Sequence, residues 1–166
     1  MAPTLRINAV AYISPQNQPI LIRTFNEKNE EAVKYHYIAH TSLDVIEERM
    51  APENKNTECY LGLLYAMEDV AVYGYVTPLR VKIVVAFALS DSVVRDIEVN
   101  TIFKALHMAY YHAISNPFLK LDSATEPLSE KSVYLLAGSP RWKNFRRRVD
   151  DVCRAVSNPA PPVAIA

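Results

Sequence analysis

Glycine is scarce in this chain of 166 residues, which has only Gly62, Gly74 and Gly138. A phosphate-binding loop of the Gly-x4-Gly-Lys type, or the Gly-x-Gly-x-x-Gly turn of a dinucleotide-binding domain, needs glycines at close and fixed spacings. These three positions provide neither spacing. The sequence therefore argues against a nucleotide-dependent enzyme of either kind.

Cysteine and long apolar runs are also lacking. Cys59 and Cys153 are the only cysteines, and without metal-type spacing or a secretory context they are expected to be reduced thiols. The first residues, MAPTLRINAVAYIS, have neither the charged start nor the long apolar core of a signal peptide. No apolar run approaches the roughly 20 residues that a membrane-spanning helix needs. We therefore expect a cytoplasmic protein.

Charge of one sign is not in excess, because 18 lysines and arginines balance 18 aspartates and glutamates. Nucleic-acid binders usually have a basic excess, so no nucleic-acid partner is expected. Hydrophobic residues make up 50% of the chain, which is enough to form a core in a chain of this length. We predict one domain over residues 1–157, with a polar insert at about 119–139 and a proline-rich tail at 158–166.

Apolar residues alternate in five segments, which predicts five β-strands. The first two are joined by the turn SPQNQP and are expected to form a hairpin, and short connections between the last three indicate an antiparallel meander. The last segment is apolar on both of its faces, so the sheet needs cover on both sides. The predicted strands are residues 5–13, 20–25, 60–66, 70–76 and 81–89.

Apolar residues at steps of three and four predict helices over residues 30–50, 96–115 and 142–156. Asp96 is the expected N-cap of the second helix, and Pro52 is expected to end the first. The first helix comes between the hairpin and the meander, and the last two helices should cover the other face of the sheet. The fold class is therefore α+β.

Three separate segments, in this order, carry a family resemblance: YHYIAHTSLDVIEERM (35–50), YLGLLYAMEDVAVYGYVT (60–77) and NPF (116–118). Together they resemble the sedlin family of small subunits in the TRAPP vesicle-tethering complex, and in particular its 2-like branch. The resemblance spans roughly residues 5–118. It implies a longin-like fold, in which a five-stranded antiparallel sheet has one helix on one face and two on the other.

The resemblance also implies a function without catalysis and without a cofactor. The chain would be a non-catalytic subunit that contributes to the assembly of a complex acting in ER-to-Golgi and Golgi vesicle transport. Its partners would be other TRAPP subunits, small and large, with a Rab-type GTPase as an indirect partner. It would be cytoplasmic and peripheral to Golgi and ER–Golgi membranes, reaching them only through the complex.

The polar side of the first predicted helix contains Tyr37, Thr41, Asp44 and Glu48. An exposed carboxylate such as Asp44 is most often an ordinary surface group. The resemblance implies, however, that this helix faces larger subunits of the complex. We therefore predict that these four residues bind a partner, with Asp44 acting through hydrogen bonds or a charge pair.

His36, His40 and Asp44 are spaced four residues apart and descend one side of the same helix. Two histidines and a carboxylate could hold a transition metal, which leaves a small metal-dependent hydrolase as an alternative function. No further ligand can be named from another segment, so a solvated helix flank is favoured and no metal site is predicted. Another longin-like trafficking adaptor, a coat small subunit or a SNARE regulator, is a second alternative, although no coiled-coil heptads or membrane anchor follow.

The tripeptide Asn116-Pro117-Phe118 matches a short ligand motif of endocytic trafficking. Proline cannot continue a helix, and it disfavours helical geometry in the residue before it. The resembled family has the same tripeptide at the same helix end. We therefore interpret it as a helix stop, with Phe118 folding back on the apolar end of the helix.

Basic residues cluster near the C-terminal end of the chain, at Arg141, Lys143, Arg146, Arg147 and Arg148. Such a cluster could attract anionic lipid or an acidic partner. On a helix, however, Arg147 and Arg148 point away from the apolar residues, which is typical of a solvated face. The solvated face is the favoured interpretation, and no site is predicted there.

Overall fold

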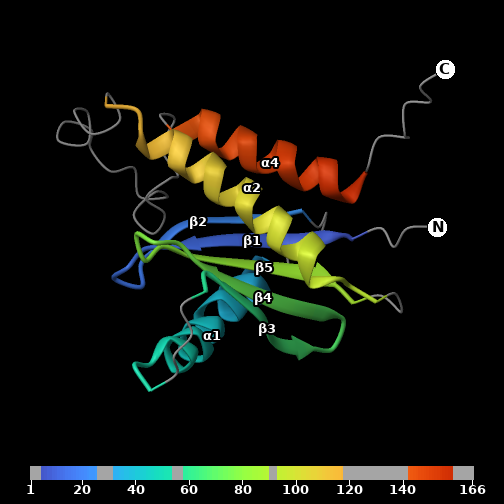
Figure 1. Cartoon of the computed structure of the whole chain (residues 1–166). Helices are drawn as coiled ribbons and strands as arrows, with labels where there is room; N and C mark the ends of the chain where they lie inside the picture. The colour runs from blue at the N-terminus through green and yellow to red at the C-terminus, as the bar shows by residue number, and fades with distance from the viewer. Residues whose placement is uncertain (1–4, 26–31, 54–57, 90–92, 118–141, 159–166) are drawn as a thin grey trace.

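A computed structural model describes residues 5–25, 32–53, 58–89, 93–117 and 142–158 (Figure 1). The predicted order of strands and helices is confirmed within these ranges. The predicted insert at 119–139 lies outside them, as do Arg141 and nearly all of the predicted tail. The elements are β1 (Ile7–Ile13), β2 (Pro19–Thr24), α1 (Ala32–Met50), β3 (Tyr60–Met67), β4 (Val70–Val76), β5 (Lys82–Ala88), α2 (Asp96–Ile114) and α4 (Lys143–Ser157).

The strands form one antiparallel sheet in the order β2-β1-β5-β4-β3. The hairpin of β1 and β2 and the meander of β3, β4 and β5 are both confirmed. The two parts join where β1 pairs with β5, for example through Val10 opposite Val85. This pairing makes β2 and β3 the two edges of the sheet.

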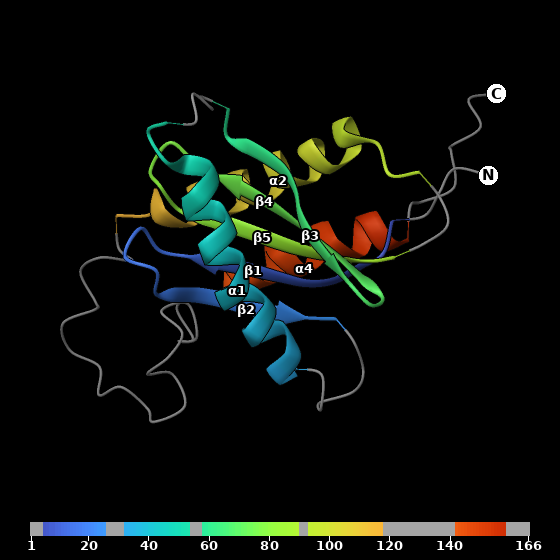
Figure 2. The same ribbon diagram turned by 90° about the horizontal axis from the view of Figure 1, so that it is seen from below.

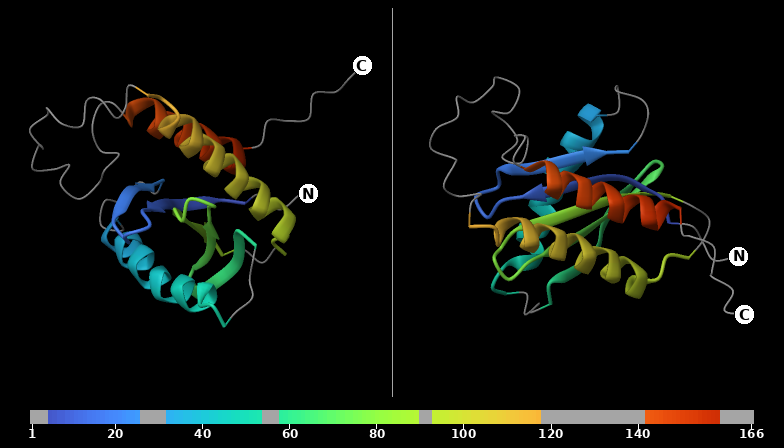
Figure 3. Two further views of the ribbon diagram at one scale, coloured as in Figure 1. Left: turned by 60° about the vertical axis from the view of Figure 1, so that its left-hand side comes forward. Right: turned by 90° about the horizontal axis from the view of Figure 1, so that it is seen from above.

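Helices cover both faces of the sheet, α1 on one side and α2 with α4 on the other (Figures 2 and 3). β5 shows why both are needed, because its side chains alternate between two buried clusters. Ile83 and Phe87 belong to the cluster beneath α2 and α4, whereas Val84 and Ala86 belong to the cluster beneath α1. A strand that is apolar on both faces requires this double cover, so the predicted fold class is confirmed.

Tyr12 connects the sheet to α2 and α4. Its buried hydroxyl donates a hydrogen bond to the carbonyl oxygen of Leu106 on α2 (2.8 Å), and its ring meets Phe145 of α4 edge to face, with centroids 5.0 Å apart. The guanidinium of Arg23 on β2 donates to both carboxylate oxygens of Asp150 on α4 (2.8 and 2.7 Å). These contacts hold α4 above the hairpin.

Both ends of α2 bear on predictions made from the sequence. Arg95, not Asp96, is the N-cap, and Asp96 is the first residue of the helix. The prediction was wrong because the Asp96 carboxylate accepts a hydrogen bond from the Tyr60 hydroxyl of β3 (2.8 Å) rather than capping the helix. At the other end the helix stops at Ile114, as the Asn116-Pro117 pair predicts. Phe118 lies outside the described residues.

The two thiols occupy different environments, which predicts different reactivity. Cys59 is half-buried and Cys153 is buried. Because the thiolate is the reactive form, one thiol per chain should react rapidly with Ellman's reagent at about pH 8, and the second only after unfolding. Replacing Cys59 with serine should abolish the rapid phase. A rapid phase that survives in Cys59→Ser would show that Cys153 is accessible.

The same burial makes stability depend on alkaline pH. Burial raises the pKa of the Cys153 thiol from its ordinary 9.0 to about 12. Above pH 9 the unfolded chain therefore releases a proton that the folded chain still holds. The free energy of unfolding should fall as the pH rises from 9 towards 12, and this loss should be smaller in Cys153→Ser when both are measured by urea denaturation.

Candidate partner-binding surface

Helix α1 has one face against the sheet and one face exposed. Its inward residues recur at helical spacing, as the sequence predicts. Full burial of each large apolar side chain among them stabilises the fold by roughly 1.5–3 kcal/mol. The outward residues are therefore determined by the same period. The buried residues of α1 are Tyr35, Ile38, Ala39, Ser42, Leu43 and Ile46.

Hydrogen bonds hold α1 to the sheet at several points. The Arg49 guanidinium donates to the carbonyl oxygens of Leu61 (2.6 Å) and Leu63 (2.7 Å) on the edge strand β3. The Tyr65 hydroxyl donates to the carbonyl oxygen of Ile38 in the middle of the helix (2.9 Å). Because the helix is fixed in this way, its outer face would lose little conformational freedom when a partner binds.

A second set of contacts joins α1 to the hairpin turn. The Asn17 side-chain amide donates to the Glu47 carboxylate (2.7 Å), and the Asn17 side-chain oxygen accepts a hydrogen bond from the Lys82 ammonium of β5. Burial lowers the pKa of Lys82, and the Glu47 charge acts in the opposite direction. Glu47 is therefore engaged within the fold.

The four predicted partner-binding residues lie on the outward side of α1. Tyr37 is 64% exposed, Asp44 and Glu48 are exposed, and Thr41 is half-buried. The Thr41 hydroxyl donates to the carbonyl oxygen of Tyr37 (2.9 Å). Asp44 has no hydrogen-bond or ion-pair partner among the described residues. The surface therefore offers a carboxylate that can still accept hydrogen bonds, and an exposed aromatic ring lies about two turns away on the same side of the helix.

The charges of α1 are distributed unevenly. Lys34 is paired with Asp69 (3.0 Å), and this hydrogen bond raises the pKa of the Lys34 ammonium and lowers that of the Asp69 carboxyl. The Arg49 guanidinium donates to carbonyl oxygens of β3. The cations of the helix are thus engaged away from Asp44, so its surroundings favour a partner that supplies N–H donors or positive charge.

The metal-binding alternative depends on His36, His40 and Asp44, which are all exposed along α1. In the ranges that the structure describes, no group of three histidine, cysteine or carboxylate side chains is placed to hold a metal ion. The described residues therefore give no support to the metal-dependent hydrolase.

Some exposed features on the opposite side of the sheet were missed in the sequence. Ile97, Met108 and Tyr111 of α2 are 80%, 49% and 50% exposed, and a pocket lies between the end of α2 and the start of α4. The apolar residues could have been found, because they lie outside the buried stripe of the same helix. No described helix is both long enough and apolar enough to span a membrane.

A protein family and several known proteins are similar to this chain. A family model described as Sedlin matches residues 12–135. The Trafficking protein particle complex subunit 2-like protein of Bos taurus is 43% identical over 113 residues, which cover 66% of this chain and 80% of that protein. The protein of the same name from Dictyostelium discoideum is 37% identical over 124 residues, which cover 73% of this chain and 88% of that protein. An uncharacterized protein of Schizosaccharomyces pombe is 28% identical over 131 residues, 78% of this chain and 87% of that protein.

Proposed function

This chain belongs to the sedlin family, and we propose that it acts in a trafficking protein particle (TRAPP) complex as a non-catalytic subunit that contributes to assembly. The observation that carries the proposal is the identity of 37–43% to relatives named for the 2-like subunit of that complex. Fold alone would not distinguish this role from that of another longin-like adaptor. The names of the relatives favour the trafficking complex.

The outer face of α1 is the proposed contact with a larger subunit. Asp44 would accept hydrogen bonds or pair with a cation, and Tyr37 would supply aromatic area, which is enriched at protein interfaces. Thr41 and Glu48 would extend the contact along the helix. Support comes from the exposure of Tyr37, Asp44 and Glu48, the absence of a described partner for Asp44, and the firm attachment of the helix to the sheet.

The proposal extends to the cellular role. The complex would act in ER-to-Golgi and Golgi vesicle transport, and the chain would lie in the cytoplasm at the periphery of those membranes. Small and large subunits would be its direct partners. A Rab-type GTPase would be an indirect partner, because the chain would present surfaces for assembly rather than perform a reaction.

Affinity purification of the tagged full chain from its own cells, followed by identification of the co-purifying chains, tests this function. We expect other subunits of the trafficking protein particle complex in near-stoichiometric amounts, and none of them in a purification with the tag alone. Recovery of coat or SNARE proteins in their place, or of no reproducible partner, would contradict the proposal.

A further inference from the structure

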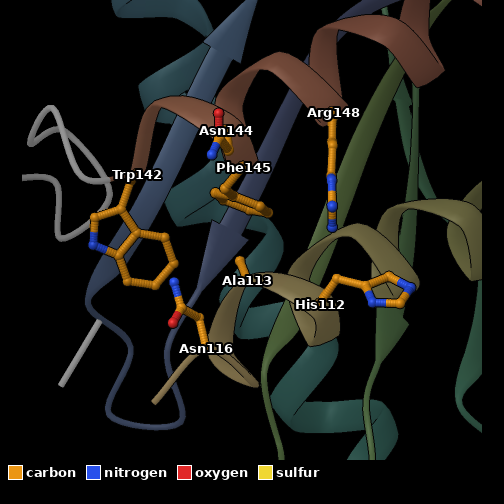
Figure 4. A pocket seen from close by; sticks show the side chains of 7 residues that line it. All are labelled: His112, Ala113, Asn116, Trp142, Asn144, Phe145 and Arg148. Carbon is orange, nitrogen blue, oxygen red and sulfur yellow. The ribbon is translucent and has the colours of Figure 1, made fainter. Parts of the chain in front are cut away.

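A pocket of about 130 Å³ lies between the C-terminal end of α2 and the N-terminal turns of α4 (Figure 4). Because the two helices run antiparallel across the sheet, residues far apart in the chain meet there. Liquid water occupies about 30 Å³ per molecule, so the pocket has room for one small polyatomic group and part of whatever carries it. It is lined by His112, Ala113, Asn116, Trp142, Asn144, Phe145 and Arg148.

The floor of the pocket is apolar and firmly packed. Phe145 is only 2% exposed, and its ring makes edge contacts with Tyr12, Tyr110 and Trp142, with centroids 5.0, 5.8 and 5.7 Å apart. Four aromatic rings packed in this way leave little freedom for the floor to collapse into the cavity. The pocket is therefore held open by the same contacts that hold α4 in place.

The rim of the pocket is rich in hydrogen-bond donors. Figure 4 shows the Arg148 side chain extending from α4 towards His112 on α2. A guanidinium has five N–H donors and no acceptor, and carboxamides such as that of Asn144 can also donate. None of the described residues that line the pocket is acidic. The carbonyl of Tyr111 near the rim is already engaged, because it accepts hydrogen bonds from the Ser115 backbone N–H (3.0 Å) and hydroxyl (2.7 Å).

Among the described residues, the charges around the rim are predominantly positive. On α4 itself, the Asp150 carboxylate is paired with Arg23, and no carboxylate forms an ion pair with Arg148 within the described part of the chain. Lys143 and Arg147 are exposed on the same helical turns. Asp151, one turn further along α4, is the exposed acidic residue that partly offsets them.

We propose that this pocket binds a phosphate monoester, held by the guanidinium of Arg148 with His112 and the carboxamide of Asn144. A phosphate monoester carries a charge of about −1.5 to −2 near pH 7 and three acceptor oxygens, and the planar fork of arginine matches two of those oxygens at once. The carrier of the phosphate is either the headgroup of a phosphorylated lipid or a soluble phosphate ester. This inference concerns a different face of the sheet from α1 and does not depend on the proposed assembly contact.

Trp142 lines the pocket and is the only tryptophan in the chain, so its fluorescence can report binding there. Titration of the full chain with inositol hexakisphosphate should produce a saturable change in Trp142 fluorescence, and unphosphorylated inositol should produce none. Arg148→Gln should weaken binding by about tenfold or more, as expected for the loss of a charge-assisted hydrogen bond. Arg147→Gln removes the same charge one residue away, outside the lining, and should weaken binding by less than about threefold through screened electrostatics alone.

Vesicles distinguish the two sources of phosphate. Phosphatidylcholine vesicles containing phosphatidylinositol phosphate should sediment the chain, with loss on Arg148→Gln, if the ligand is a lipid headgroup. Binding of the soluble ester without vesicle binding would assign the pocket to a free phosphate ester. Either result supports the phosphate site.

Three outcomes would overturn the proposed phosphate site. They are equal effects of Arg147→Gln and Arg148→Gln, binding to phosphatidylserine vesicles as strong as the binding to phosphatidylinositol phosphate vesicles of matched charge, or no saturable fluorescence change. Thermal unfolding of each variant checks its fold. Arg148→Lys, which keeps the charge but loses the planar fork, should bind between the wild type and Arg148→Gln. It provides the same test if the glutamine variant does not fold.

Discussion

Replacing Asp44 with tyrosine is expected to reduce co-purification of the larger subunits by at least about tenfold, while the chain itself remains folded. A charge-assisted hydrogen bond is worth about 1.5–3 kcal/mol, and each 1.4 kcal/mol changes a binding constant about tenfold. The new ring would also stand where a partner atom must approach. Because Asp44 is exposed and has no partner among the described residues, the folded state loses no contact. The measurement is quantitative affinity purification of tagged wild type and variant.

Asp151→Tyr is the matched control for this experiment. Asp151 is likewise an exposed carboxylate, but it lies on α4, on the other side of the sheet, so co-purification of the larger subunits should be unchanged. Thermal unfolding and circular dichroism should show that both variants keep the wild-type fold. Equal recovery of the larger subunits with Asp44→Tyr and with the wild type would remove Asp44 from the proposed contact.

Replacing Phe145 with alanine is expected to lower the free energy of unfolding by about 3–5 kcal/mol. This is a large part of the 5–15 kcal/mol that stabilises a typical domain. The ring is only 2% exposed and contacts Tyr12 of β1 and Tyr110 of α2. Its removal would leave a cavity where α4, α2 and the sheet meet. The measurement is urea denaturation, with unfolding monitored by circular dichroism.

Tyr111→Ala is the control for the aromatic truncation. Tyr111 lies on α2 but is 50% exposed, so its replacement should change stability by much less, within about 1 kcal/mol. A similar loss in both variants would mean that truncation of any aromatic residue in this layer, rather than the packing of Phe145, determines the effect. A loss below about 1 kcal/mol in Phe145→Ala would show that α4 contributes little to the fold.

The layers of the fold could be predicted because each depends on a local pattern. The alternation of Ile83, Val84, Val85 and Ala86 assigns neighbouring side chains of one strand to opposite faces, and a strand of that kind needs helices on both sides. The helical period of α1 likewise determined which residues face the core. The same period predicts that Asp44 faces outward.

Contacts between distant segments could not be predicted. Arg23 and Asp150 are 127 positions apart, and nothing in the neighbouring sequence of either residue indicates the other. Arg147 and Arg148 are adjacent and equally basic, and the sequence assigned both to a solvated face. The structure shows both exposed, yet only Arg148 lines the pocket with His112.

The sequence by itself thus determined the order of strands and helices and the buried side of each, because burial of one face imposes a period that can be read along a short segment. The tertiary structure alone decided that β1 lies beside β5, that Asp96 bonds to Tyr60 instead of capping its helix, and that α2 and α4 enclose a pocket. These features depend on how separate segments pack in space, and packing is specified by the whole set of buried contacts rather than by any local period.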